Sequence, residues 1–169
     1  MLYFSYGSNM SSLRLRNRTQ SASPKGMAKL YGHTLTFHKK SDKDGSGKCD
    51  AYETLNNDDI VYGVTYQIDE REIGILDRVE GLGYGYGKKA VSLTMESGDQ
   101  VSAFTYYAID IDAGLKPFCW YKEHVVLGAV EHGLPQDYTT ALMAVEHMDD
   151  YDASRIEKEL SIYRLRQRS

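Results

Sequence analysis

The order of strand and helix patterns along this chain leaves few folds open to it. Alternating runs typical of strands recur up to residue 109, with one helical pattern among them, and helical patterns follow in the remainder. This order predicts an α+β domain with an antiparallel or barrel-like sheet. A chain of 169 residues is long enough for one domain with its own core, so we expect a single domain over residues 1–169.

The expected strands differ in how clearly the sequence marks them. Asp59–Ile68 alternates most clearly, and Lys89–Glu96 with Gln100–Ile109 has the pattern of a hairpin. Lys25–Lys40 has the composition of a broken strand pair, with Gly32 at the bend. The Asp, Gly and Ser residues of Ser41–Asp50 predict a polar loop, for which an ordinary surface role is a better interpretation than a lid.

The chain opens with a strand that runs into a polar turn. Leu2–Ser5 has the aromatic composition of a strand, and Gly7, Ser8 and Asn9 favour turns over extended backbone. Ser11 is placed to cap a short helix. The loop would then present backbone N–H groups to a carboxylate or an oxyanion, although most strand–turn–helix openings are simple connections.

One helix places a carboxylate among apolar side chains. Asp69 and Gly81 are the start and stop signals of a helix over Glu70–Glu80, and Glu72 is placed to complete a capping box with Asp69. Glu80 projects into the apolar arc of this helix. Local conflicts of this kind tend to occur at functional sites. Two structural interpretations remain open: a carboxylate that reaches solvent at the helix end, or one that accepts tyrosine hydroxyls.

Further helices are predicted near the C-terminus. Pro117 is placed to start one, and Gly133 with Pro135 ends it and starts a second. From Ser154 onward, apolar residues at helical spacing predict a final amphipathic helix.

Composition and charge exclude several classes of function. A net charge of −4 without a long basic tract argues against nucleic acid as the main partner, and Arg14, Arg16 and Arg18 are interpreted as a solvated face. Cys49 and Cys119 are too far apart in sequence for a zinc motif and suggest reduced thiols. The chain has no apolar run long enough to span a membrane, so we expect a cytoplasmic protein.

Two motifs about seventy residues apart carry a resemblance to a known family. Leu2-Tyr3-Phe4-Ser5-Tyr6-Gly7-Ser8-Asn9 resembles the N-terminal signature of the γ-glutamylcyclotransferase family. Leu76-Asp77-Arg78-Val79-Glu80-Gly81 is similar to the family motif Leu-Asp-x-x-Glu-Gly. Tyr121, in Tyr121-Lys122 ahead of Gly128-Ala129, matches a substrate-binding tyrosine, and Gly133-Leu134-Pro135 followed by Tyr138 is similar to the vertebrate-type enzymes.

The resemblance implies a fold and a reaction. The fold would be a small, mixed, mainly antiparallel β-barrel flanked by helices, with neither a metal nor a cofactor. The reaction would be an intramolecular acyl transfer that turns a γ-glutamyl-amino acid into 5-oxoproline and the free amino acid. Glu80 would be the catalytic proton acceptor. Burial would suit its carboxylate to that role, because desolvation raises the pKa of a carboxyl group toward neutral pH. The implied substrate-binding residues are Tyr3, Phe4, Ser5, Tyr6, Gly7, Ser8, Asn9 and Tyr121.

Several alternatives stay open at this point. The enzyme could act on γ-glutamylamines instead, or the chain could be a non-catalytic small-molecule-binding protein of the same fold. Ser8 lacks the Gly-x-Ser-x-Gly elbow of a hydrolase nucleophile, and the five histidines show no convincing metal-ligand spacing. Tyr84 and Tyr86 are expected at the edge of the site or in the sheet, without an assigned role. We expect a small-molecule substrate and a monomer or homodimer.

Overall fold

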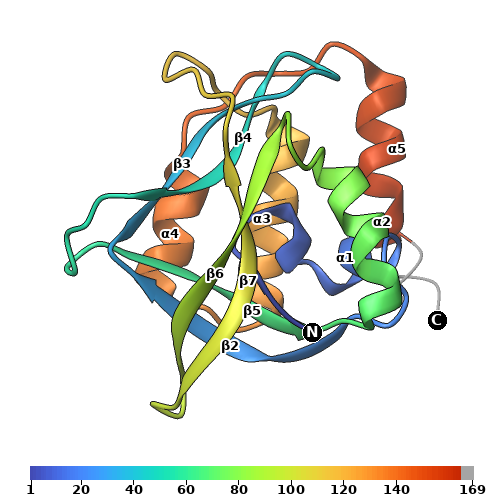
Figure 1. Ribbon diagram of the computed structural model, residues 1–169. Coiled ribbons are helices and arrows are strands. Elements are labelled where there is room, and N and C mark those ends of the chain that lie inside the picture. The colour runs from blue at the N-terminus through green and yellow to red at the C-terminus, as the bar shows by residue number, and fades with distance from the viewer. Residues whose placement is uncertain (165–169) are drawn as a thin grey trace.

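The computed structural model describes residues 1–164, and five strands in it close into a barrel (Figure 1). Strand β1 (Leu2–Ser5) pairs antiparallel with β5 (Ile60–Gln67) and, through Tyr3 and Phe104, parallel with β7 (Gln100–Ala108). The order around the barrel is β1–β5–β2–β6–β7. This confirms the predicted mixed, mainly antiparallel barrel with flanking helices. The other barrel strands are β2 (Ser23–Tyr31), β5 (Ile60–Gln67), β6 (Tyr86–Met95) and β7 (Gln100–Ala108).

A separate two-stranded sheet was only partly predicted. Strand β3 (His33–Lys40) follows β2 after Gly32, whose positive φ of 73° makes the bend. The two strands do not pair with each other, so the expected strand pair is wrong: β3 pairs instead with β4 (Gly47–Glu53). The expected loop over Ser41–Asp50 is therefore too long, because β4 takes its last four residues.

The helices gather around one side of the barrel (Figure 1). Helix α3 (Cys119–Glu131) packs against the opening 3-10 turn η1 (Ser8–Met10) and against α4 (Gln136–Ala144). Helix α5 (Ala153–Arg164) contacts both α1 (Ser12–Arg16) and α3. The third helix begins at Cys119, two residues after the predicted start at Pro117. The elements are η1 (Ser8–Met10), α1 (Ser12–Arg16), α2 (Glu70–Glu80), α3 (Cys119–Glu131), α4 (Gln136–Ala144) and α5 (Ala153–Arg164).

The ends of α2 fix where Glu80 lies. The Asp69 carboxylate accepts a hydrogen bond from the Arg71 N–H (3.0 Å), and Gly81 ends the helix in the left-handed conformation with φ 68°. Glu72 does not complete the predicted capping box, because its carboxylate accepts from the Ser21 N–H (3.0 Å) and hydroxyl (2.6 Å) instead. The helix still covers the predicted residues and delivers Glu80 at its last position.

A close approach between η1 and α3 brings the opening loop to the later helices. A Cβ atom at Gly128 of α3 would lie 2.6 Å from the Ser11 backbone nitrogen and 2.6 Å from Met10 Cβ. Only glycine leaves room for this packing. None of the helices between residues 1 and 164 has both the length and the apolar character needed to span a bilayer.

Candidate active site

A small pocket opens where the β1 end, the following loop, α2 and α3 meet. Its volume is about 30 Å³, and it lies next to a larger cleft of about 720 Å³ that shares four of its residues. Those shared residues are Ser8, Glu80, Tyr86 and Tyr121. The inner pocket is lined by Tyr3, Ser5, Tyr6, Gly7, Ser8, Asn9, Cys49, Glu80, Tyr86, Tyr106 and Tyr121.

Glu80 is held through one of its two carboxylate oxygens. Glu80 Oε1 accepts hydrogen bonds from Asn9 Nδ2 (2.9 Å) and from Arg18 Nη1 (3.1 Å). Arg18 Nη1 also donates to Asn9 Oδ1 (2.6 Å). Within residues 1–164, no hydrogen bond reaches Glu80 Oε2. The carboxylate is thus anchored at one oxygen, and the other oxygen is available to a ligand.

Arg18 compensates the charge that the pocket encloses. The Glu80 side chain is 15% exposed and the Arg18 side chain 22%. Burial, followed by the nearby Arg14 charge, lowers the pKa of Arg18 from its ordinary value. Removing one member of such a pair would leave an uncompensated buried charge. Arg18 is therefore a positioning residue. The prediction that Arg14, Arg16 and Arg18 form a solvated face is wrong for Arg18, and also for Arg14, whose side chain is 13% exposed and pairs with Glu159.

The opening loop comes close to β4 and α3 at Gly7. A Cβ atom there would lie 2.9 Å from Cys49 Cβ and 3.5 Å from the Tyr121 hydroxyl. The Cys49 N–H donates to that hydroxyl at 3.1 Å. Gly7 therefore lets the loop, β4 and Tyr121 converge on one small volume.

Donors of the loop remain available to a ligand. The Met10 N–H donates to the Gly7 carbonyl (2.9 Å), but no backbone bond between residues of 1–164 uses the N–H groups of Gly7 or Ser8. The Ser5 hydroxyl is buried and also has no partner among the described residues. Unpaired polar groups at a pocket wall favour an occupant that bonds to them.

Buried tyrosines and a cysteine complete the walls. Burial is the main cause that raises the pKa values of Tyr3, Tyr6, Tyr86 and Tyr121, so these hydroxyls stay protonated and are donors. Tyr86 donates to the Cys49 carbonyl at 2.7 Å. Burial also raises the pKa of the Cys49 thiol to about 12, which makes it a poor nucleophile.

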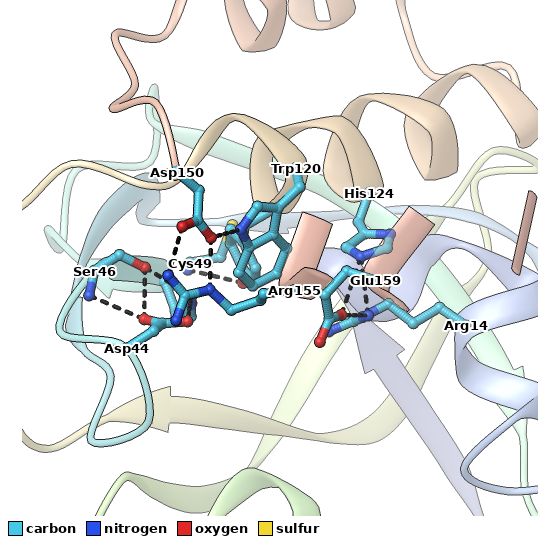
Figure 2. A network of polar contacts seen from close by, with 11 residues as sticks. Arg14, Asp44, Ser46, Cys49, Trp120, His124, Asp150, Arg155 and Glu159 are labelled. Carbon is cyan, nitrogen blue, oxygen red and sulfur yellow. Dashed lines mark hydrogen bonds and ion pairs between the residues drawn. The ribbon is translucent and has the colours of Figure 1, made fainter. Parts of the chain in front are cut away.

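The outer cleft is bounded on one side by α5. Figure 2 shows Arg14, His124 and Glu159 joined on this wall: Arg14 Nη1 donates to Glu159 Oε2 (2.7 Å) and to His124 Nε2 (2.9 Å). A second group links the start of α5 to α3, with Trp120 Nε1 and Arg155 donating to Asp150 (Figure 2). These contacts hold the cleft wall in place.

The structure brings all but one of the predicted site residues to the inner pocket. Phe4 does not line it, because neighbouring residues of a strand face opposite sides and its ring is fully buried in the core. No sequence pattern assigned Tyr106 or Cys49 to the site, and the role of Arg18 was missed. The only sequence signal for Arg18 is its spacing of four residues from Arg14, which would place both on one face of a helix.

The site contains no group of side chains suited to a metal ion, as far as residues 1–164 describe it. Between residues 1 and 164, no three His, Cys, Asp or Glu side chains come together in an arrangement that would hold a metal ion.

Comparisons with known proteins agree with the resemblance seen in the sequence. The model of the AIG2-like family matches residues 60–142, a range that includes Glu80 and Tyr121. A γ-glutamylcyclotransferase of Bos taurus is 29% identical over 153 residues, covering 88% of this chain and 80% of the relative. The Homo sapiens γ-glutamylcyclotransferase is 29% identical over 151 residues, covering 88% of this chain and 80% of the relative.

Solved structures give the same result for the fold. A structure described as γ-glutamyl cyclotransferase superimposes with a TM-score of 0.85 at 26% identity, over 96% of this chain and 98% of that one.

Proposed function

We propose that this chain, a protein of the γ-glutamylcyclotransferase family, converts a γ-glutamyl-amino acid into 5-oxoproline and the free amino acid. The observation that carries the proposal is Glu80, which lies where the inner pocket meets the outer cleft and has one carboxylate oxygen anchored.

In this reaction Glu80 takes a proton from one nitrogen and later gives it to another. Oε2 takes a proton from the α-ammonium of the γ-glutamyl group, and the free amine then attacks the γ-carbonyl carbon to form a five-membered ring. As the tetrahedral intermediate collapses, the C–N bond to the amino acid breaks and Glu80 returns the proton to the leaving nitrogen. The ring nitrogen gives up its second proton through solvent, and the released amino acid takes one up as its ammonium group, so the protons balance. One carboxylate thus acts first as base and then as acid. Arg18 and Asn9 keep the carboxylate aimed at both nitrogens.

The pocket supplies orientation and charge stabilisation. The inner pocket is small, which suits a carboxylate or a carbonyl end, and the rest of the substrate extends into the larger cleft. The N–H groups of Gly7 and Ser8, with the Tyr121 hydroxyl, are candidate donors to the substrate carboxylate or the developing oxyanion. Because both reacting groups belong to one molecule, holding them together provides much of the acceleration.

The proposal also covers surroundings of the enzyme. The reaction needs only a small-molecule substrate, so we propose no cofactor. We also propose that the protein is a monomer or a homodimer. Two free cysteines, Cys49 and Cys119, fit a reducing compartment, and we propose the cytoplasm.

The test measures, by mass spectrometry, the 5-oxoproline that the protein releases from each member of a panel of γ-glutamyl-amino acids and γ-glutamylamines. We expect the wild type to release it and Glu80→Gln to lose at least ~10²-fold in kcat, since a positioned proton-transfer group contributes about 10²–10⁴-fold. Glu70→Gln, at the exposed start of the same helix, is the matched control and keeps wild-type activity.

Three other results would contradict or change the proposed function. Full activity in Glu80→Gln would remove Glu80 from the chemistry. No release from any panel member by the folded wild-type protein would reject the enzyme and favour a binding protein. Preference for amines would indicate the γ-glutamylamine alternative.

A further inference from the structure

The outer cleft contains a buried lysine without an acidic partner. Lys39, near the end of β3, is 7% exposed, and its side chain lines the cleft. Within residues 1–164, no side-chain hydrogen bond or ion pair involves its ammonium group. The contact found for this ammonium is with the face of the Tyr86 ring, 5.2 Å from the centroid.

Other cations of the cleft are already paired. Arg14 pairs with Glu159, Arg18 with Glu80, and Lys48 with Asp44. Arg155 pairs with Asp150. Two further lysines of the lining, Lys43 and Lys158, are exposed. Lys39 is thus the buried cation of this cleft whose charge the described side chains leave uncompensated.

Lys39 lies beside the reacting end of the cleft. A Cβ atom on Gly85 would be 3.1 Å from Lys39 Nζ and 3.1 Å from the Glu80 carbonyl oxygen, so the ammonium adjoins the turn that follows Glu80. Tyr86, under the ammonium, lines both the inner pocket and the cleft. Lys39 and Glu80 thus line the same cleft.

The Lys39 side chain is largely buried but its ammonium group is open to the cleft, so an anion in the cleft would meet a partly desolvated charge that no described carboxylate compensates. If the γ-glutamyl end occupies the inner pocket, the anion that a γ-glutamyl-amino acid brings into the cleft is the carboxylate of its leaving amino acid. A γ-glutamylamine brings none at that place.

We propose that Lys39 binds the carboxylate of the leaving amino acid and so selects γ-glutamyl-amino acids over γ-glutamylamines. The proposal rests on the function proposed above, and it assigns the discrimination between the two substrate classes to one side chain.

The experiment compares two ligands that differ by one carboxylate, γ-glutamyl-alanine and γ-glutamyl-ethylamine. Binding is measured by calorimetry in the Glu80→Gln background, where no turnover is needed, and KM is measured with Glu80 intact. Lys39→Met keeps the stem over Tyr86 without the charge, and Lys39→Arg keeps the charge. The control is Lys40→Met, which removes an exposed lysine outside the cleft lining.

Lys39→Met should weaken binding of γ-glutamyl-alanine and raise its KM by about ten- to a hundredfold, the loss expected for a hydrogen bond between charged groups. The same variant should change the binding affinity and the KM for γ-glutamyl-ethylamine by no more than about twofold. Lys39→Arg should restore most of the preference, and Lys40→Met should behave as wild type.

Two results would overturn the proposal. An equal loss for both ligands would place Lys39 on the glutamyl end, and no loss for either would leave it without a ligand. The two proposals fail in different ways: binding with the Lys39-dependent preference but no 5-oxoproline would reject the enzyme alone. If neither ligand binds, both the proposed function and the proposed role of Lys39 are rejected.

Discussion

Glu80 shows how a residue that conflicts with its local pattern is accommodated. The sequence places its carboxylate in the apolar arc of α2, and the side chain is indeed largely buried, with 15% exposed. Arg18, from beyond α1, neutralises its charge, and Asn9 fixes its orientation. The conflict and the position of Glu80 are visible in the sequence. The contact with Arg18 is not, because it joins residues 62 apart through the packing of separate elements.

Gly7 is the second residue on which the site depends. Its absent side chain allows the loop to lie against Cys49, and a Cβ atom would come within 2.9 Å of Cys49 Cβ. We predict that Gly7→Ala lowers the free energy of unfolding by about 1–3 kcal/mol, the usual cost of overpacking a buried site. It should also lower kcat/KM by about ten- to a hundredfold, since small displacements of positioning groups reduce catalysis strongly.

The measurement is denaturant unfolding together with 5-oxoproline release. Gly74→Ala is the control, because Gly74 is exposed within α2 and its nearest neighbour would be a flexible arginine atom at 3.8 Å. That change should stabilise the protein by about 0.5–1 kcal/mol and leave activity unchanged. A Gly7→Ala protein with wild-type stability and activity would show that the loop does not need this close approach.

At the scale of elements, α5 is attached to the rest of the domain through a buried histidine. His124 of α3 lies between Arg14 of α1 and two residues of α5, Glu159 and Tyr163. Arg14 has only donors, so His124 Nε2 must accept (2.9 Å), and Nδ1 then carries the proton that bonds the Tyr163 hydroxyl (2.7 Å). The geometry therefore requires neutral His124.

This requirement makes stability depend on pH. Burial, outweighing the neighbouring Glu159, lowers the pKa of His124 to about 4, below the ordinary 6.5 of the unfolded chain. The unfolded state therefore binds a proton first as the pH falls. The stability is fully present above pH ~6.5 and is lost progressively down to pH ~4. Between pH 7 and pH 5 we predict a loss of about 2 kcal/mol from this group.

Denaturant unfolding at pH 7 and pH 5 measures the effect. His124→Gln should be less stable than wild type at pH 7 and should lose less on acidification. An unchanged difference between the two pH values in His124→Gln would show that another group causes the pH dependence.

Local signals explain which elements were predictable. Asp69 and Gly81 mark α2 at both ends, and Gly98, with φ 92°, makes the turn of the β6–β7 hairpin that alternation predicted. Strand β4 was missed because Gly47 follows a glycine- and aspartate-rich segment that has the composition of a loop. Its strand character comes from pairing with β3, which the sequence does not reveal.

For the whole molecule, barrel closure brings the two motifs together. Tyr3 pairs with Phe104, and β1 then delivers its following loop to the end of α2, so Asn9 and Glu80 meet across 71 residues. The resemblance predicted this barrel and most of the pocket residues, but not Cys49, Tyr86 or Tyr106. The physical pattern alone predicted an α+β domain with an antiparallel or barrel-like sheet. It did not decide between an open sheet and a closed barrel, because closure depends on long-range pairings such as the parallel contact of β1 with β7.

The most direct test of the account follows the oxygen atoms of the reaction. The protein is incubated with γ-glutamyl-alanine in water enriched in ¹⁸O, beside a sample without protein, and the products are analysed by mass spectrometry. Because the substrate's own amine is the nucleophile, the account predicts equal amounts of 5-oxoproline and alanine, with no ¹⁸O in either. Glutamate carrying ¹⁸O would show that water attacks the γ-carbonyl, and this would contradict the intramolecular transfer on which the account rests.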